Sequence, residues 1–495
     1  MMQPLTCVTS QVNNYDQQGE ATMLSKKRER QGVTAVTQLK ERRKVWMVVF
    51  LAVMTLTSLS LASGPFDLSL EQEIAIGKQA RALILSTHIV HAKASDYLAR
   101  IGRRLISAGS WDPQFAHTYS FYVVEDPENP EMLNAFCAPG GFICFYRALF
   151  EDLLNNYGED AVAAVLAHEI EHANRHHLAK QIKRDRERGF WAGLAAAVLG
   201  GILGGGERSM DIAFSLAEIY TKLQSLKYSR DLEDEADERG IVRLWRAGYD
   251  PKAMADVFNY LAHRTGSKPP EYLSTHPPEE ERIKRSLQRA EVLKQLRPGL
   301  TIQNEVKVIR EGKKIYLPVG WVHGLTSGMS VEIAGKTFKL SKVYFDRAEV
   351  DVKEKDAKNI PDDANAILKE VPTPPHAQPV GVGTVLKVNP EDQTIVIDLG
   401  AWHGIQEGMN FRIYSWRFEE QAQFKGKTYT VRVARVIAEC QVQSVGEKES
   451  ILKVVSFRKK ALEGAPGEQY TITDILPGDE ARWSEWLLPK PIGKQ

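Results

Sequence analysis

The segment from His168 to His172, which reads His-Glu-Ile-Glu-His, constrains what this chain can fold into more than any other part of the sequence. Residues four apart on an α-helix stand on the same face, so both imidazoles can reach one metal ion. Glu169 would then lean toward the open position of that metal. Gly158 precedes two acidic residues, which are common at the start of a helix. Ala161, Val165, His168 and His172 then recur at helical spacing, so the segment is predicted to be a helix. The pattern is typical of zinc-dependent hydrolysis; two surface histidines paired with glutamates are the alternative.

A second acidic segment, from Asp231 to Asp237, offers the third metal ligand that such a site needs. Glu233 and Asp237 are one helical turn apart, so one carboxylate can bind zinc while the other accepts a ring N–H from a ligand histidine. Ala236 and Gly240 are small residues that would let two ligand-bearing helices approach closely. Without the upstream histidines, this acidic run would be interpreted as a solvated helix face.

With both segments in place, the chain resembles the gluzincin metallopeptidases. That family includes the CAAX prenyl endopeptidase, the HtpX-type heat-shock protease, the mitochondrial inner-membrane stress protease and the periplasmic BepA-type proteases. The resemblance spans roughly Leu70 to Leu293, and the further residues that carry it are Glu73, Ile74, Gly77, Asn134-Ala135-Phe136, Pro139-Gly140-Gly141, Arg175-His176 and Ser274-Thr275-His276-Pro277. It implies that His168, His172 and Glu233 bind one Zn²⁺ per chain and that Glu169 is the general base.

The N-terminal part of the chain has the pattern of an export signal. Residues 1–44 are a polar extension that ends in Lys40-Glu41-Arg42-Arg43-Lys44, and an apolar run follows at 45–62. A basic region, a short apolar region and Ser60-Leu61-Ala62 predict a signal peptide cleaved before Ser63. A retained signal anchor is the alternative, although a spanning helix usually needs ~20 apolar residues.

Cleavage after Ala62 would leave Cys137, Cys144 and Cys440 of the four cysteines. In an oxidising compartment, these three thiols can form at most one disulfide and leave one thiol unpaired. Cys137 and Cys144 flank a Pro-Gly-Gly turn closely enough to pair, but two buried thiols beside the active site are the preferred interpretation.

A small β-sheet is predicted ahead of the metal-binding helix. Tyr119 to Val124 and Gly141 to Tyr146 are rich in aromatic and β-branched residues and are bounded by Pro and Gly. An edge strand in such a position binds a substrate main chain by β-addition. The candidates for peptide binding are therefore Gly140, Gly141, Phe142, Ile143 and Cys144, with an ordinary core hairpin as the alternative.

Two further segments are candidate parts of the active site. Residues 189–206 are apolar and glycine-rich and lie between the two ligand segments, which suits either a lid or membrane-surface loop over the cleft or a buried helix of small residues. His276 precedes two prolines and three glutamates, which predicts that it stands at a helix start. A neutral imidazole there could contact the zinc, its water or the oxyanion, so His276 joins Glu169 and Asp237 as a candidate catalytic residue.

Beyond residue 300 the chain changes to short β-like runs that contain an internal repeat. The segment Gly320–Met329 aligns with Gly400–Met409, so that Gly, His, Gly, Gly and Met coincide. His323 and His403 are interpreted as repeated turn residues rather than metal ligands, and Pro372 to Pro375 as a stiff linker. The predicted domains are a metallopeptidase domain at 66–297, β modules at 300–371 and 380–478, and a tail at 479–495.

The predicted fold class is α+β, with a mainly α zincin-type protease domain that holds a small β-sheet and is followed by two small β domains. With 64 basic and 63 acidic residues the formal net charge is +1, so the chain has no strong overall positive potential that would attract nucleic acid. We expect an exported zinc endopeptidase of a bacterial periplasm or cell envelope that hydrolyses protein or peptide substrates. Envelope proteins would be recruited by the β modules, and residues 45–62 would mediate any membrane association. The alternative is a non-proteolytic envelope assembly factor in which zinc is structural.

Overall fold

The structure is a computed structural model that describes residues 70–109, 118–184, 226–264, 270–277, 280–296, 304–370, 379–424, 427–460 and 468–486. The predicted N-terminal extension, signal segment, glycine-rich stretch at 189–206 and linker at 372–375 lie outside these residues. Within the described residues, no helix is both long and apolar enough to cross a membrane.

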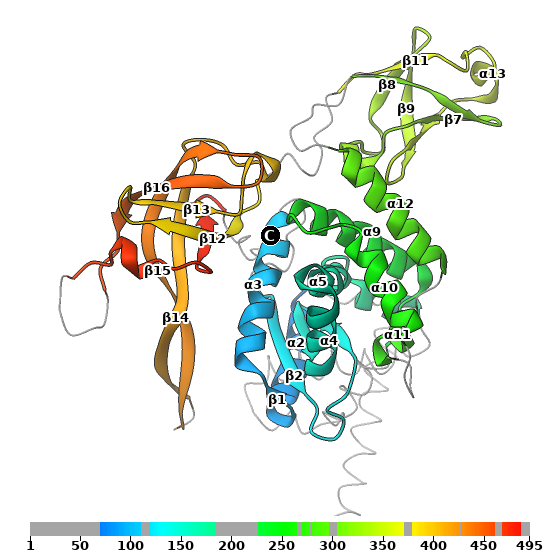
Figure 1. Ribbon diagram of the computed structural model, residues 1–495. Helices are drawn as coiled ribbons and strands as arrows, with labels where there is room; N and C mark the ends of the chain where they lie inside the picture. The colour runs from blue at the N-terminus through cyan, green and yellow to red at the C-terminus, as the bar shows by residue number, and fades with distance from the viewer. Residues whose placement is uncertain are drawn as a thin grey trace, which may run out of the picture. The chain divides into compact units, whose positions relative to one another are not determined.

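The first domain is mainly helical, as the sequence predicted (Figure 1). Its helices are α2 (Leu70–Thr87), α3 (Ala92–Ala108), α4 (Arg147–Tyr157), α5 (Glu159–Asn174), α6 (His177–Arg184), α9 (Arg230–Arg246), α10 (Ala253–His263), α11 (Glu271–Thr275) and α12 (Glu280–Gln295). Its strands are β1 (Ile89–Val90), β2 (Ser120–Glu125), β3 (Ala135–Ala138) and β4 (Phe142–Tyr146).

Helix α5 is the centre of this domain. It begins after Gly158, whose φ of +78° suits glycine, and Glu159 and Asp160 stand in its first turn, where acidic side chains favour the helix dipole. Every residue from Ala161 to Asn174 is buried, including both histidines of the motif, because α3, α4, α9 and α10 pack around α5 (Figure 1). A helix that is buried all round needs small residues, and alanine supplies them here.

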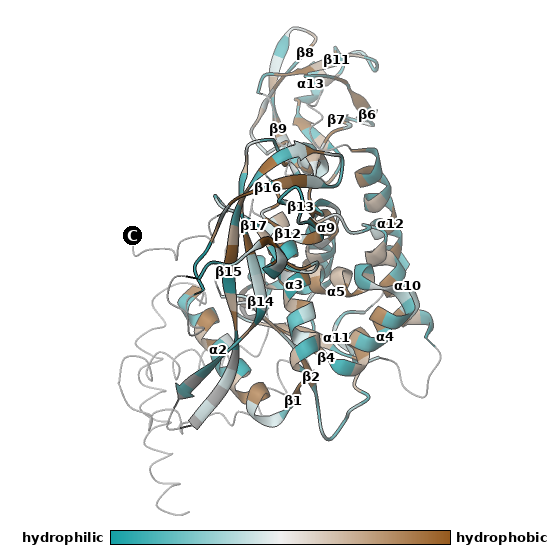
Figure 2. Ribbon diagram, turned by 60° about the vertical axis from the view of Figure 1, so that its left-hand side comes forward, coloured by the Kyte–Doolittle hydropathy of each residue, from teal (hydrophilic) through white to brown (hydrophobic). Residues whose placement is uncertain are grey.

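Helices α5 and α9 pack closely at the position the sequence predicted. A Cβ added to Gly240 of α9 would lie 3.3 Å from the backbone nitrogen of His168. Such a contact is tighter than packed atoms usually make, so a larger residue at 240 would push the two helices apart. By contrast, α12 alternates hydrophilic and hydrophobic residues along its length, as expected of a helix with one exposed face (Figure 2).

The small sheet has the strand order β1-β2-β4-β3, with β2 parallel to β4 and β3 antiparallel to it. The two predicted strands are present. However, β4 lies between β2 and β3, so the prediction that residues 140–145 form an edge strand is wrong. The edge strand on that side is β3, which the sequence analysis did not identify as a strand because four residues carry too little periodicity.

The described cysteines are free thiols, as the preferred interpretation predicted. Cys137 in β3 and Cys144 in β4 are free thiols on adjacent strands, and Cys440 is a buried free thiol. Cys137 and Cys144 form no disulfide, and Cys144 is buried as predicted, whereas Cys137 is half-buried and borders the pocket at Glu169.

The first β module is a seven-stranded antiparallel sheet with the order β5-β11-β8-β9-β10-β7-β6. Its strands are β5 (Glu305–Lys307), β6 (Ile309–Glu311), β7 (Lys314–Leu317), β8 (Ser330–Ile333), β9 (Lys336–Val343), β10 (Ala348–Asp351) and β11 (Asn365–Leu368). Its apolar residues form their own cluster, which includes Ile315, Val331 and Leu340.

The second β module is a closed barrel with the order β12-β13-β16-β15-β14-β17. Its strands are β12 (Val382–Asn389), β13 (Thr394–Ile397), β14 (Asn410–Phe424), β15 (Lys427–Val445), β16 (Ser450–Phe457) and β17 (Glu480–Trp483). The predicted module end at residue 478 is too early, because β17 closes the barrel by pairing with both β12 and β14.

The internal repeat encodes the same turn in both modules. The 3₁₀ turns η2 (Trp321–His323) and η4 (Ala401–His403) each end in a histidine whose Nδ1 accepts a hydrogen bond from the N–H of the preceding Gly320 or Gly400, at 3.0 Å in both cases. In the described structure these histidines are therefore turn residues, as predicted.

Candidate metal centre

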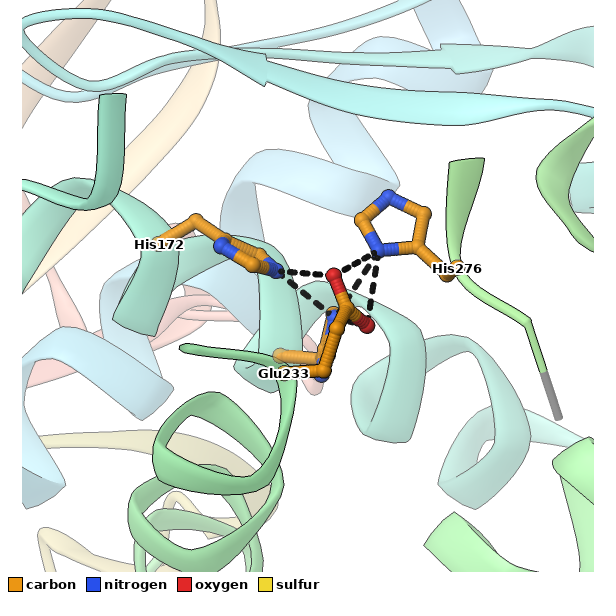
Figure 3. Close-up of side chains that lie close together, drawn as sticks. His172, Glu233 and His276 are labelled. Carbon is orange, nitrogen blue, oxygen red and sulfur yellow. Dashed lines mark hydrogen bonds and ion pairs between the residues drawn. The ribbon is translucent and has the colours of Figure 1, made fainter. Parts of the chain in front are cut away.

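Four buried side chains from three parts of the first domain meet at one point. His168 and His172 come from α5, Glu233 from α9, and His276 directly follows α11; their ligand atoms all lie within 4.8 Å of one another. His168 Nε2 lies 2.9 Å from His172 Nε2 and 3.2 Å from His276 Nδ1, and His276 Nδ1 lies 3.0 Å from Glu233 Oε1. Figure 3 shows His172, Glu233 and His276 converging.

These separations fit a tetrahedral zinc ion. Zn–N and Zn–O bonds of ~2.0–2.1 Å place neighbouring ligand atoms about 3.3 Å apart. The contacts between Glu233 and the histidines of α5 both measure 3.5 Å, so these five separations, from 2.9 to 3.5 Å, lie near this value. Three imidazoles and one carboxylate are also a donor set that zinc prefers. The residues present therefore suit the ion expected from the sequence.

His276 reaches the cluster in a different way from that predicted. It is the C-cap of α11 rather than the start of a helix, and its N–H donates to the carbonyl of Tyr272 at 2.9 Å. Its ring stacks on that of Tyr272, with the centroids 4.6 Å apart. The next described helix, α12, runs from Glu280 to Gln295. The end of α11, not a helix N-terminus, therefore positions this imidazole.

Asp237 lies where the helical spacing placed it. Its Oδ1 is 2.8 Å from His168 Nδ1, which leaves Nε2 of that ring directed at the cluster. The guanidinium of Arg282, from α12, donates to both carboxylate oxygens of Asp237 at 2.8 and 2.9 Å and lies 3.0 Å from Glu233 Oε2. Burial alone would raise the pKa of Asp237, but Arg282 and His168 lower it to about 2. The sequence alone does not point to Arg282, because nothing local distinguishes one arginine of a basic helix from the others.

His172 has a different outer partner. Its Nδ1 lies 2.9 Å from Nδ1 of His177, and Nε2 of His177 lies 3.3 Å from Glu235. The ring of Tyr228 stacks on His172 at a centroid distance of 4.0 Å. His177 was also missed, although it follows His176 within the segment that carried the family resemblance. His176 itself contacts Glu73 of α2 at 2.7 Å, so two residues of that resemblance meet in space.

Glu169 lies beside the cluster, next to His276. It is 1% exposed, and its Oε1 lies 3.5 Å from Nε2 of His276. Burial raises the pKa of this carboxyl, as suits a group that must take up a proton. A small pocket adjoins it, lined by Asn134, Phe136, Cys137, Glu169, Leu226, Tyr228, Thr275 and His276.

Burial and neighbouring charges shift the pKa values of His168 and His172 in opposite directions. Burial opposes a charge on His168, but Asp237 and Glu233 outweigh it and raise the pKa of His168 to about 10. Burial and the neighbouring His168 hold the pKa of His172 well below its usual value. Burial alone would raise the pKa of Glu233, but His276 and His168 hold it well below the usual range. Since zinc binds neutral imidazole, metal uptake would release a proton from His168.

The predicted peptide-binding residues do not line this pocket. Gly140 and Gly141 form the turn between β3 and β4, with φ values of +75° and +88°, and a Cβ on Gly140 would meet the backbone of α2 at Ile74. None of the five predicted residues at 140–144 lines the pocket at Glu169, which is bordered by β3 instead. The turn glycines therefore serve the packing of α2 against the sheet in the described structure.

Comparison with known proteins supports this interpretation of the site. Residues 92–290 match the model of peptidase family M48, a range that contains all four cluster residues, Glu169 and Asp237. The chain is 30% identical over 258 residues to the beta-barrel assembly-enhancing protease of Escherichia coli. The alignment covers 51% of this chain and 50% of that protein. These matches confirm the resemblance expected from the sequence.

Other relatives match the same part of the chain. A putative beta-barrel assembly-enhancing protease of Vibrio cholerae is 31% identical over 228 residues, 45% of each protein. The mitochondrial metalloendopeptidase OMA1 of Arabidopsis thaliana is 33% identical over 190 residues, 38% of this chain and 35% of that one. The chain thus spans about half the length, or less, of these curated relatives.

Proposed function

From the match of residues 92–290 to peptidase family M48, we propose that this chain is a zinc-dependent endopeptidase. The observation that carries the proposal is the convergence of His168, His172 and Glu233 on one point with Glu169 beside them. A purely structural zinc site needs no adjacent base, whereas hydrolysis does.

His168, His172 and Glu233 would hold the ion, with Asp237 keeping the ring of His168 in the orientation that presents Nε2. When bound, zinc lowers the pKa of water to about 7 and polarises a carbonyl group. Arg282 holds the two carboxylates of α9 in place from the outside.

Glu169 would act as the general base. It takes a proton from the attacking water on Oε1 or Oε2 and returns it to the leaving amine, which completes hydrolysis of the peptide bond. Its raised pKa follows from burial and keeps it competent to carry that proton between the two steps. The pocket bordered by Phe136 and Cys137 would then hold the substrate residue next to the scissile bond.

The substrate main chain would pair with β3. This strand is the edge of the described sheet, and its residues Phe136 and Cys137 border the pocket at Glu169. An extended peptide added to an edge strand gains main-chain hydrogen bonds without sequence selection. This position replaces the strand at 140–145 that the sequence suggested.

His276 would restrain the enzyme at rest. A catalytic zinc site has three protein ligands and leaves its fourth position open to water or substrate, and His276 Nδ1 lies in the place of a fourth ligand. Because it directly follows the five-residue helix α11, a small movement of that helix would withdraw it. Hydrolysis would therefore require the displacement of His276.

The cell envelope of a bacterium is the proposed location. The basic segment and apolar run at 40–62 have the pattern of an export signal, and the matched relatives in Escherichia coli and Vibrio cholerae are named for β-barrel assembly. The substrates would be envelope proteins, which the two β modules would recruit. In the second module, β14 and β15 continue past the last residue paired with β17, Tyr414, and form a long two-stranded ribbon suited to such contacts.

Replacing Glu169 by glutamine tests the function. The variant should retain about one zinc per chain and the native fold but hydrolyse an unfolded protein substrate at least ~10²-fold more slowly, as expected for loss of a general base. The matched control is Glu151→Gln, which changes an exposed glutamate of α4 outside the site. Zinc content is measured by elemental analysis and hydrolysis by mass spectrometry of the products. Unchanged turnover in the Glu169 variant would move the protein to the class of non-proteolytic assembly factors.

A further inference from the structure

The two β modules share one topology. In the second module, β12 closes the barrel by pairing with both β13 and β17. In the first module, residues 305–311 take the equivalent position, because β5 pairs with β11 and β6 pairs with β7. The remaining strands follow in the same order, so β8 and β9 correspond to β14 and β15, and the repeated turn precedes β8 and β14 alike. The first module therefore shows how much chain this fold requires.

The central hairpin differs greatly in length between the two modules. In the first module, a turn of two residues, Ala334 and Gly335, joins β8 to β9. In the second, Ile413 pairs with Ala438 at the equivalent position, and residues 414–437 take the place of that turn. Figure 1 shows β14 continuing beyond the other strands of the barrel. Since the same fold forms with the short turn, the barrel does not need the longer hairpin.

The outer part of this hairpin has no neighbouring strands. Residues 418–424 of β14 and 427–433 of β15 form seven consecutive pairs, and we call this part the ribbon. Strand β14 pairs with β17 only as far as Tyr414, and β15 pairs with β16 only as far as Ala438. Within the part of the chain that the structure describes, no strand pairs with either outer edge of the ribbon. At ~3.4 Å per residue, each edge is about 24 Å long.

Such an edge offers main-chain hydrogen bonds to another strand. Alternate residues of an antiparallel edge direct their N–H and C=O groups outward, and a two-stranded ribbon by itself is only marginally stable in water. Proteins usually protect such edges with proline, lysine or a β-bulge. The ribbon contains no proline, and the irregular register of β14 lies at its base, between Ser415 and Phe418. Neither of these devices therefore prevents a further strand from pairing with the ribbon.

The outer edge of β14 is the less protected of the two. Residues 418–424 contain no lysine or arginine, whereas Lys427 and Arg432 stand on the ribbon strand of β15. At the base of the ribbon, the N–H of Arg458 donates to the carbonyl of Ile437 at 2.9 Å, so the chain that follows β16 continues along the side of β15. We therefore expect a further strand to add to β14.

The two faces of the ribbon determine which side chains an added strand should carry. Four uncharged polar residues are exposed on one face, namely Gln421, Gln423, Thr428 and Thr430. The opposite face begins with the half-buried apolar pair of Phe418 and Val433. Successive side chains of a strand point to opposite faces, so an added strand would extend both. A segment in which polar and apolar residues alternate suits this edge best.

The charges of the ribbon do not select an acidic or a basic partner. Glu419 lies 3.7 Å from Arg432 on the neighbouring strand, and Arg432 also contacts Asp96 of α3. Glu420 lies 3.3 Å from Arg435. Because both glutamates have a cation beside them, main-chain pairing and the alternation of side chains would decide what binds.

We propose that the outer edge of β14 in the ribbon binds an extended peptide segment by strand addition, and that the segment carries polar and apolar residues in alternation. An unfolded stretch of another protein offers such a segment, with its main chain free to pair. Strand addition itself needs no hydrolysis; only the identification of the bound segment as part of a substrate rests on the proposed function.

Binding of a defined peptide to the full-length Glu169→Gln variant tests this edge without cleavage of the probe. The probe is a fluorescein-labelled ten-residue peptide of alternating threonine and valine with serine at both ends, and fluorescence polarisation should show saturable binding at one site per chain. The same peptide N-methylated at four consecutive central residues keeps its side chains but loses donors on both of its edges. It should bind at least about tenfold more weakly. A peptide of the same composition with its valines grouped should also bind more weakly.

The first module suggests a variant that lacks the ribbon. Replacing residues 416–434 by Asn-Gly joins Ser415 and Arg435, which are paired, through a two-residue turn of the length found between β8 and β9. The barrel should still fold, as circular dichroism and thermal unfolding would show, and the peptide should bind at least about tenfold more weakly.

A pair of double variants identifies the edge and remains informative if the shortened hairpin does not fold. Gln421→Lys with Gln423→Lys places on β14 the residue type that protects natural edges, and it should weaken binding of the uncharged peptide about tenfold. Thr428→Lys with Thr430→Lys adds the same charge at the paired positions of β15, one strand further from the bound peptide, and binding should stay within about twofold.

Four results would overturn the proposal. The first is the absence of saturable binding, and the second is equal affinity for the N-methylated peptide. The third is that the lysines on β15 weaken binding while those on β14 do not, which would move the site to the other edge. The fourth is a dimer in analytical ultracentrifugation that requires the ribbon and that excess peptide does not dissociate, which would make a second copy of this chain the occupant. Hydrolysis is not measured in these experiments, so a negative result leaves the proposed peptidase function standing.

Discussion

Replacing Arg282 by methionine should weaken metal binding although Arg282 is not a metal ligand. Its guanidinium is 3% exposed and bonds both oxygens of Asp237, which in turn contacts the ring of His168. It also lies 3.0 Å from the carboxylate of Glu233. One side chain from α12 therefore holds the outer partner of His168 and contacts a second metal ligand, Glu233, directly.

The size of the effect follows from these contacts. Loss of an outer partner of a metal ligand typically lowers metal affinity by 10–100-fold, which equals ~1.4–2.8 kcal/mol. Methionine fills similar volume but leaves Asp237 buried without its cation, and breaking such a pair in the metal-free protein costs about 3–5 kcal/mol of folding stability. Arg282→Lys retains the charge but loses the two-pronged geometry, so its effect should be intermediate.

Competition with a chelator of known affinity, monitored by zinc analysis, measures the change. The control is Arg285→Met on the same helix, whose partner is Asp234 at 3.2 Å in a more exposed pair. An exposed pair is worth ~0–1 kcal/mol, so this control should bind zinc like the unaltered protein. Equal zinc affinity for Arg282→Met and Arg285→Met, in folded protein, would refute the assignment of Arg282 as a support of the metal site.

Two further changes give equally direct tests. His276→Ala should increase kcat/KM for a short peptide while zinc content stays at about one per chain, because the fourth ligand position becomes free; a decrease would instead mean that His276 contacts the transition state. Arg243→Met removes the cation that lies 2.6 Å from the fully buried Glu171 and should lower the free energy of unfolding in urea by about 3–5 kcal/mol. A loss below about 1 kcal/mol would mean that Arg243 does not stabilise the fold through this buried pair.

The sequence determined the parts of this protein that depend on local spacing. His168 and His172 share a face because they are four residues apart on a helix, and the same rule puts Glu233 and Asp237 together on α9. Ala236 and Gly240 are also four residues apart, so the sequence predicted a small-residue face of α9 and a close helix contact at Gly240. The repeated glycine-histidine pattern likewise predicted identical turns, since a turn is set by a few consecutive residues.

Only the tertiary structure decided which distant segments meet. Arg282 bonds Asp237, which lies 45 positions earlier in the sequence. Strand β4 pairs with β2 on one side and β3 on the other, so β3 and not β4 is the edge strand. The strand that closes the barrel, β17, was taken for part of a tail because its partners are far upstream. Pairing across such distances depends on the packing of the whole domain, and no local period of hydrophobic or polar residues records it.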